Sequence, residues 1–133
     1  MEQIEITIAG LPAPQGSKQI MRGRLIEVSG AKLKVWRKAI AQACIDAHSS
    51  ELIQGPVQVE VNFYLPRPVS VKIAKRNYPI VPPDLDKLSR GLLDGIGQSE
   101  VIWRDDSQVV SLIARKYYDD IHQTGAEVRI TAL

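Results

Sequence analysis

Residues 84–97 read Asp-Leu-Asp-Lys-Leu-Ser-Arg-Gly-Leu-Leu-Asp-Gly-Ile-Gly, and they decide the fold. The apolar residues of this segment recur at the spacing of a helix. This spacing predicts a helix over residues 84–97. We expect the late glycines, Gly95 and Gly97, to end this helix.

The segments on either side of this helix predict strands. Residues 57–63 alternate between apolar and polar side chains, and residues 126–132 do the same. Residues 107–118 are almost continuously apolar, so we expect that strand to be central and buried on both faces. Earlier in the chain, residues 2–9 alternate as a strand, and residues 31–48 carry one apolar helical stripe after Ser29 as N-cap.

The predicted order is β-α-β-α-β-β. It indicates an α+β fold, a mixed sheet with helices packed against it, in a single domain over residues 1–133. The 133 residues carry a net charge of +2, which excludes a polycation and a disordered acidic tail. Residues 1–83 have a net charge of +5 and residues 84–133 a net charge of −3. The chain has one cysteine and neither a signal peptide nor a stretch apolar enough to span a membrane, so we expect a cytoplasmic protein.

Two pairs of carboxylates flank the predicted helix. Asp84 and Asp86 lie at its start, and Asp105 and Asp106 precede the next strand. A short connection after the helix would bring the pairs together, and a hard cation such as Mg²⁺ would relieve their repulsion. The spacing alone favours the structural alternatives, because Asp also caps helices and forms turns.

The same residues resemble the RusA family of Holliday-junction resolvases, small endodeoxyribonucleases of bacteria and phages. The resemblance rests on Asp84-Leu85-Asp86-Lys87-Leu88, then Leu92-Leu93-Asp94-Gly95, then Asp105-Asp106-Ser107-Gln108-Val109-Val110, and it ends at Arg115-Lys116. It is specific over about residues 80–118 and extends weakly over the whole chain, including the proline-rich Leu11-Pro12-Ala13-Pro14-Gln15-Gly16.

The resemblance implies an enzyme, an Mg²⁺-dependent endodeoxyribonuclease in DNA recombination and repair, with Mn²⁺ as an alternative cofactor. It implies that Asp84, Asp86 and Asp106 hold the metal and that Asp105 assists. The basic catalytic role belongs to Arg90, to Lys87 or to both, since this sequence departs from the family pattern at both positions. The resemblance also implies a homodimer that makes two symmetric nicks in a four-way DNA junction; we infer no protein partner and no membrane partner.

Cations, most of them in residues 1–83, predict the surface that holds DNA, because phosphate binding needs positive charge near an acidic site. Lys116 joins them because it matches a basic residue at the end of the family's central strand. We expect this surface to include Lys18, Arg22, Arg24, Lys34, Arg37, Lys38, Lys72, Lys75, Arg76 and Lys116. Residues 66–83 are rich in proline and contain no acid, which favours a flap over the junction. Trp36 and Trp103 are assigned to the core or a dimer interface.

Two other functions remain open from the sequence. One is a junction-binding DNA module without catalytic activity, which would bind four-way junctions without Mg²⁺ and leave them intact. The other is a metal-dependent nucleotide phosphohydrolase, which would need a small enclosed pocket and would have no use for the basic segment.

Overall fold

The structure is a computed structural model that describes residues 2–16, 18–21, 23–27 and 30–133, with the backbone alone for residues 18–21 and 24–27. The elements in chain order are β1 (Gln3–Ala9), β2 (Lys18–Met21), β3 (Arg24–Glu27), α1 (Gly30–Ala47), β4 (Val57–Leu65), α2 (Leu85–Ser99), the short 3-10 helix η1 (Asp106–Gln108), β5 (Val109–Tyr118) and β6 (Gly125–Ala132).

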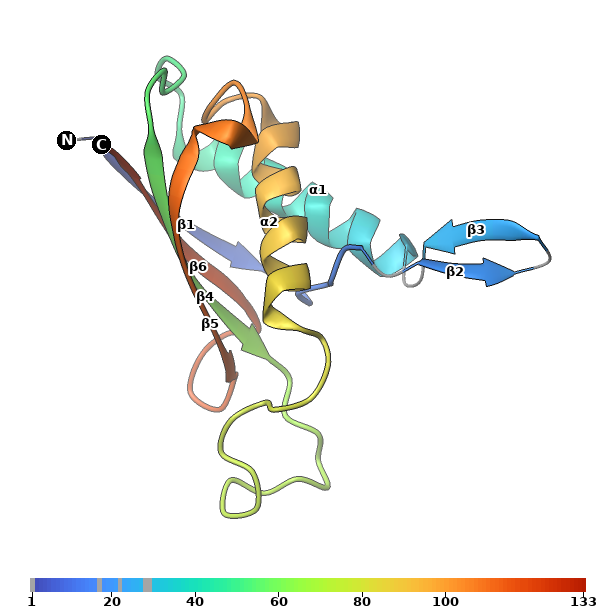
Figure 1. The fold of residues 1–133 in the computed structure, drawn as a ribbon. Helices are drawn as coiled ribbons and strands as arrows, with labels where there is room; N and C mark the ends of the chain where they lie inside the picture. Colours follow the sequence, from blue (N-terminus) through green and yellow to red (C-terminus); the bar gives the residue numbers. More distant parts are fainter. Residues whose placement is uncertain (1, 17, 22, 28–29) are drawn as a thin grey trace.

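The main sheet has four strands in the order β1-β6-β4-β5. β4 and β5 are parallel and are joined by a crossover through α2, whereas β6 is antiparallel to both β1 and β4. Both helices lie on one face of this sheet and leave the other face open (Figure 1). The predicted α+β class with a mixed sheet and helices packed against it is therefore confirmed.

The core lies between the helices and the covered face of the sheet. Alternate residues of β1, Ile4, Ile6 and Ile8, are buried there, as the period of two predicts. The buried stripe of α1 contains Leu33, Trp36, Ile40 and Cys44, and α2 contributes Leu88, Leu92 and Ile96. Trp36 and Trp103 are both core residues, 1% and 2% exposed.

The predicted end of α2 at its glycines is wrong. A Cβ on Gly95 would come within 2.9 Å of three side-chain atoms of Ile40, so this glycine allows α1 and α2 to pack closely. The helix continues to Ser99 and ends at Glu100, whose φ of 60° lies in the left-handed region. Gly95 is thus a packing residue in the middle of a helix.

The prediction that the strand over residues 107–118 is central is also wrong. β5 pairs only with β4 among the described residues and forms one edge of the sheet, while the central strands are β6 and β4. Val110 and Leu112 are exposed on it. A continuous apolar run is typical of a strand covered on both faces, and here much of that cover is missing in a single chain.

A two-stranded hairpin, β2 and β3, precedes α1 and is absent from the predicted order of elements. Gly23 lies in its turn with φ +76°, a left-handed conformation that favours glycine. The hairpin extends away from the main sheet beyond the start of α1 (Figure 1). Ser29, the predicted N-cap of α1, lies outside the described residues. No helix in the described part of the chain is long and apolar enough to cross a membrane.

Candidate active site and nucleic-acid interface

The N-terminal end of α2 presents the first carboxylate pair. Asp84 is the N-cap residue, but its side chain accepts no capping hydrogen bond, and Asp86 lies in the first turn. Both residues are exposed. The Lys87 ammonium lies 3.9 Å from the Asp84 carboxylate. Since Asp84 does not use its carboxylate to cap the helix, the structural alternative does not account for this side chain.

Hydrogen bonds from a lysine side chain hold the segment that leads into this end of α2. The Nζ of Lys116, near the end of β5, donates to the carbonyl oxygens of Val81 and Pro83, each at 2.9 Å. Lys116 therefore anchors the chain just before Asp84. The sequence assigned it to DNA binding and gave no sign of this anchoring contact, because its partners are carbonyl groups about 35 residues away in the chain.

The proline-rich segment over residues 11–16 lies beside the first turns of α2. The backbone N–H of Gln15 donates to the carbonyl of Lys87 at 3.0 Å. A Cβ on Gly16 would come within 2.9 Å of the guanidinium of Arg90, so this guanidinium rests against the segment. Arg90 is exposed on α2 one turn after Asp86. Both candidate catalytic cations therefore lie next to the first carboxylate pair.

Asp105 is engaged in a structural turn. Its carboxylate accepts from the backbone N–H of Ser107 at 2.9 Å. Interaction with the Ser107 side chain and this backbone bond lower the pKa of Asp105. The side chain of Gln108 accepts from the Asp105 N–H at 3.1 Å and donates to the carbonyl oxygens of Ile53 and Gly55. Together these bonds form a capping box for η1, which confirms the turn alternative for Asp105.

Asp106 lies against the C-terminal half of α2. Its Oδ1 accepts from the indole Nε1 of Trp103 at 3.0 Å, and a Cβ on Gly97 would lie 3.1 Å from the same oxygen. Burial raises the pKa of Asp106, and the neighbouring carboxylates of Asp94 and Asp105 raise it further. Gly97 thus makes room for a carboxylate.

Asp94 joins this second carboxylate pair to α1. The Nη2 of Arg37 lies 3.8 Å from the Asp94 carboxylate and also donates to the Oε1 of Gln15. Arg37 is half-buried, and its Nε has no partner among the described residues. The prediction that Arg37 belongs to a phosphate-binding surface does not account for these contacts. Sequence reasoning assigned no function to Asp94, although it is the acid in the middle segment of the family resemblance.

The two carboxylate pairs are not together in one chain. Asp86 lies in the first turn of α2 and Asp106 lies beside Gly97, eleven residues along the helix, which corresponds to about 16 Å of helix axis. No group of three His, Cys, Asp or Glu residues that could hold a metal ion occurs in the described part of the chain. The connection after α2 therefore does not gather Asp84, Asp86 and Asp106 as the sequence suggested.

The other predicted DNA-binding residues have varied surroundings. Lys34 and Lys38 on α1, and Lys72 and Lys75 in the loop after β4, are exposed. The Nε of Arg76 donates to the hydroxyl of Tyr118 at 2.7 Å. Lys18 and Arg24 belong to the hairpin strands, where only the backbone is described, and Arg22 lies outside the described residues.

Arg67, which carries no predicted role, organises the loop over residues 66–83. Its guanidinium forms an ion pair with Asp120 at 2.6 Å and lies 4.1 Å from the centre of the Tyr118 ring. It also donates to the carbonyl oxygens of Val71, Arg76 and Asn77. Arg67 therefore holds the predicted flap at the end of β5, in addition to the Arg76–Tyr118 hydrogen bond and the two bonds from Lys116.

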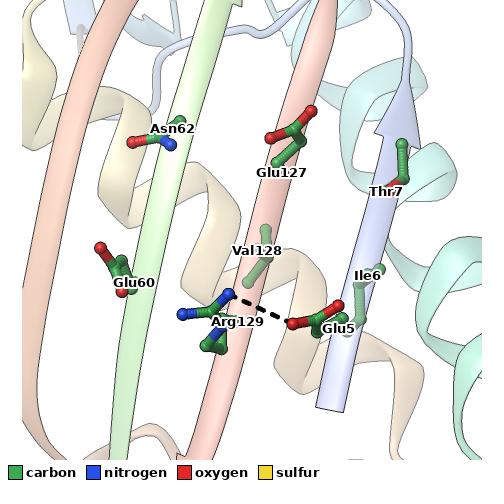
Figure 2. Close-up of a pocket in the computed structure, with 8 residues that line it drawn as sticks. All are labelled: Glu5, Ile6, Thr7, Glu60, Asn62, Glu127, Val128 and Arg129. Carbon is green, nitrogen blue, oxygen red and sulfur yellow. Dashed lines mark ion pairs between the residues drawn. The ribbon is translucent and has the colours of Figure 1, made fainter.

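The open face of the sheet carries a shallow depression of about 220 Å³. Figure 2 shows the residues that line it: Glu5, Ile6, Thr7, Glu60, Asn62, Glu127, Val128 and Arg129. Arg129 pairs with Glu5 at 3.2 Å, and Arg115 pairs with Glu60 at 2.9 Å. Three glutamates against one arginine in the lining give this depression negative charge, which disfavours contact with phosphate.

Two comparisons identify known proteins that are similar to this chain. The family model described as "Endodeoxyribonuclease RusA" matches residues 10–131. The chain is also similar to a protein of Bacillus subtilis (strain 168) described as "Uncharacterized protein YqaN", with 30% identity over 131 residues, which cover 90% of this chain and 91% of that protein. The family match spans both carboxylate pairs, β4, β5 and all but the last residue of β6, and it begins just after β1.

Proposed function

The chain belongs to the RusA family of endodeoxyribonucleases, and from this premise we propose that it resolves four-way DNA junctions by Mg²⁺-dependent hydrolysis in recombination and repair. The observation that supports this proposal most is the family match over residues 10–131, which includes an exposed carboxylate pair beside two cations at the start of α2.

The residues at the start of α2 fit a divalent cation in their chemistry. Mg²⁺ takes one or two carboxylates, keeps several waters and is completed by substrate phosphate. Asp84 and Asp86 supply hard oxygen donors, and the Asp84 carboxylate is not used as a helix cap. Asp84 and Asp86 would hold the ion, which when bound would lower the pKa of an attacking water and neutralise charge on the phosphate.

Asp106 is proposed as the third acid of the catalytic set, but one chain holds it about 16 Å along α2 from Asp86. We propose a homodimer, in which two-fold symmetry presents identical sites to two equivalent strands. Such a dimer contains two copies of each carboxylate. Each metal site could then take acids from both chains.

The cations near the first carboxylate pair orient the phosphate. Arg90 rests on the segment over residues 11–16, so its guanidinium is held close to the start of α2. Lys87 lies beside Asp84 and reduces the repulsion within the acidic pair while the site is empty of DNA. A fixed cation at either position would stabilise the negative charge that develops on the phosphate during hydrolysis.

The DNA contact surface is proposed on the helix side of the molecule. The exposed Lys34 and Lys38 of α1, the hairpin with Lys18 and Arg24, and the loop with Lys72 and Lys75 carry the charge that binds phosphates. The opposite, open face of the sheet carries the acidic depression of Figure 2. The hairpin extends beyond the body of the domain, where it would reach a second arm of a junction (Figure 1).

The proposal is tested by cleavage of a labelled synthetic four-way junction beside a linear duplex of the same sequence. We expect nicks in the junction with Mg²⁺ or Mn²⁺, none in EDTA, and little cleavage of the duplex. Asp86→Asn should abolish cleavage but retain binding, whereas the matched control Asp46→Asn, an exposed acid on α1, should cleave normally.

Each alternative function gives a different result in this assay. Tight junction binding without cleavage under any metal would identify a binding module and reject the nuclease. Release of phosphate from nucleotides, with the junction left intact, would identify a phosphohydrolase. If Asp86→Asn cleaves as well as the unmodified chain, the proposed carboxylate site is wrong although the nuclease activity remains.

A further inference from the structure

The four-stranded sheet has two edges, and they differ in character. β1 forms one edge, and its exposed positions include Glu5, a charge that discourages pairing with another strand. β5 forms the other edge, and in the described part of the chain it has β4 as its one partner. Its second side therefore presents unpaired backbone N–H and C=O groups along ten residues.

The exposed edge strand is apolar in its middle. Val110, Leu112 and Ile113 expose 64%, 43% and 37% of their surfaces. Residues 107–114 contain no charged side chain and no proline, the usual devices that protect an edge from association. An apolar edge of this length is a site for addition of another strand.

The charges at the two ends of β5 indicate which strand that is. Asp105 and Asp106 lie just before β5, and Arg115 and Lys116 lie near its end. An antiparallel copy of the same strand would place the acidic end of one opposite the basic end of the other. The strand is therefore complementary to itself in charge as well as in its apolar middle.

We propose that β5 pairs antiparallel with β5 of a second copy of this chain, with the two-fold axis at Ser111. In this register Val110 lies opposite the partner's Leu112. Val109 stays outside this regular pairing, because β5 has a register shift between Val109 and Ser111, which pair with Val57 and Gln58 of β4. Side chains directly opposite one another in an antiparallel pair contact on the same face. The two four-stranded sheets become one continuous sheet with all four helices on the same face.

This inference rests on the homodimer of the proposed function and names the surface that forms it. It accounts for the apolar sequence of residues 109–114, which in a single chain is incompletely covered. The side chain of Ser111 is partly buried on the open face, where its hydroxyl donates to the Oε1 of Gln58 at 3.1 Å. A residue on the two-fold axis tests the register directly, because it lies opposite the same residue of the second chain.

The test uses disulfide formation by Ser111→Cys in the full chain. The one native cysteine, Cys44, is buried, and burial raises the pKa of its thiol to about 11, so it contributes no background. We expect Ser111→Cys to form a covalent dimer under mild oxidation. The control Val35→Cys, 72% exposed on α1, should stay uncrosslinked under the same conditions.

A second variant checks the same surface without a crosslink. Leu112→Lys places like charges near the axis, and we expect the dimer Kd by analytical ultracentrifugation to rise about 100-fold, about tenfold for each copy of the change. Val35→Lys should leave the Kd unchanged. Circular dichroism of both variants verifies that the fold is retained.

The outcomes separate this inference from the proposed function. A dimer in which Ser111→Cys does not crosslink and Leu112→Lys is without effect would overturn the β5 interface, as would a monomer at micromolar concentration, even if the junction is cleaved. A dimer that crosslinks through position 111 but cleaves no junction would support the interface and reject the nuclease.

Discussion

The ammonium of Lys116 donates to the carbonyl oxygen of Pro83 at 2.9 Å, so the end of β5 is bonded to the residue that precedes Asp84. A second hydrogen bond runs from the same ammonium to the carbonyl of Val81. The two bonds together hold the loop at two points. The position of the first carboxylate pair therefore depends on a lysine on another element.

Replacement of Lys116 by Met should loosen this loop. Hydrogen bonds from a charged group are stabilising by about 1.5–3 kcal/mol, and we expect a loss near the lower end because Lys116 is partly exposed. Urea unfolding measures that loss, and junction cleavage should fall while the salt dependence of binding stays nearly the same. Loss of binding alone, with unchanged stability and kcat, would show that Lys116 is a plain phosphate contact.

Asp105 and Asp106 should respond differently to substitution although they are adjacent. Asp105→Ala removes the cap of η1 and should destabilise the fold by about 1 kcal/mol with cleavage retained at a temperature where the variant is folded. Asp106→Asn should retain the fold and lose cleavage. Thermal unfolding and junction cleavage on both variants check this pair, and loss of activity in the folded Asp105→Ala variant would contradict it.

The loop over residues 66–83 should loosen in acid. The hydrogen bond from Arg67 lowers the pKa of Asp120 below its ordinary value of about 3.9, so the pair stabilises the loop at neutral pH. This contribution is lost as the pH falls through the lowered pKa, in the window below about pH 4. Amide exchange in residues 69–78 should speed up in that window, whereas Arg67→Met should show fast exchange at neutral pH.

The exposed lysines of α1 should contribute to DNA affinity through counterion release. The double variant Lys34→Gln with Lys38→Gln should reduce the slope of log K against log salt by about 2, one for each phosphate contact. The control Arg129→Gln changes a cation on the open face, where it pairs with Glu5, and should leave the slope unchanged. Equal slopes for all three proteins would move the DNA interface away from α1.

Much of the fold follows from local patterns in the sequence. Ile4, Ile6 and Ile8 alternate because one face of β1 is buried, and the α1 stripe repeats every three or four residues because one side meets the sheet. Gly95 could not be interpreted this way, since a glycine that ends a helix and a glycine that admits Ile40 look alike in sequence.

The carboxylate site was less predictable because it depends on distances between elements. Asp86 and Asp106 are separated in sequence by a helix, and a helix places its two ends far apart whatever the length of the loop that follows. The edge position of β5 was missed for a related reason. Its apolar residues Val110 and Leu112 predict cover on both faces, and the proposed second copy supplies the partner that one chain lacks.

The most direct measurement of the central claim is the product formed from a supercoiled plasmid that carries an extruded cruciform. A homodimer that makes two symmetric nicks within one binding event should convert the plasmid to linear DNA in Mg²⁺, and Asp86→Asn should leave it supercoiled. Nicked circles without linear product, or an intact plasmid in both Mg²⁺ and Mn²⁺ despite tight binding, would contradict paired junction resolution by this chain.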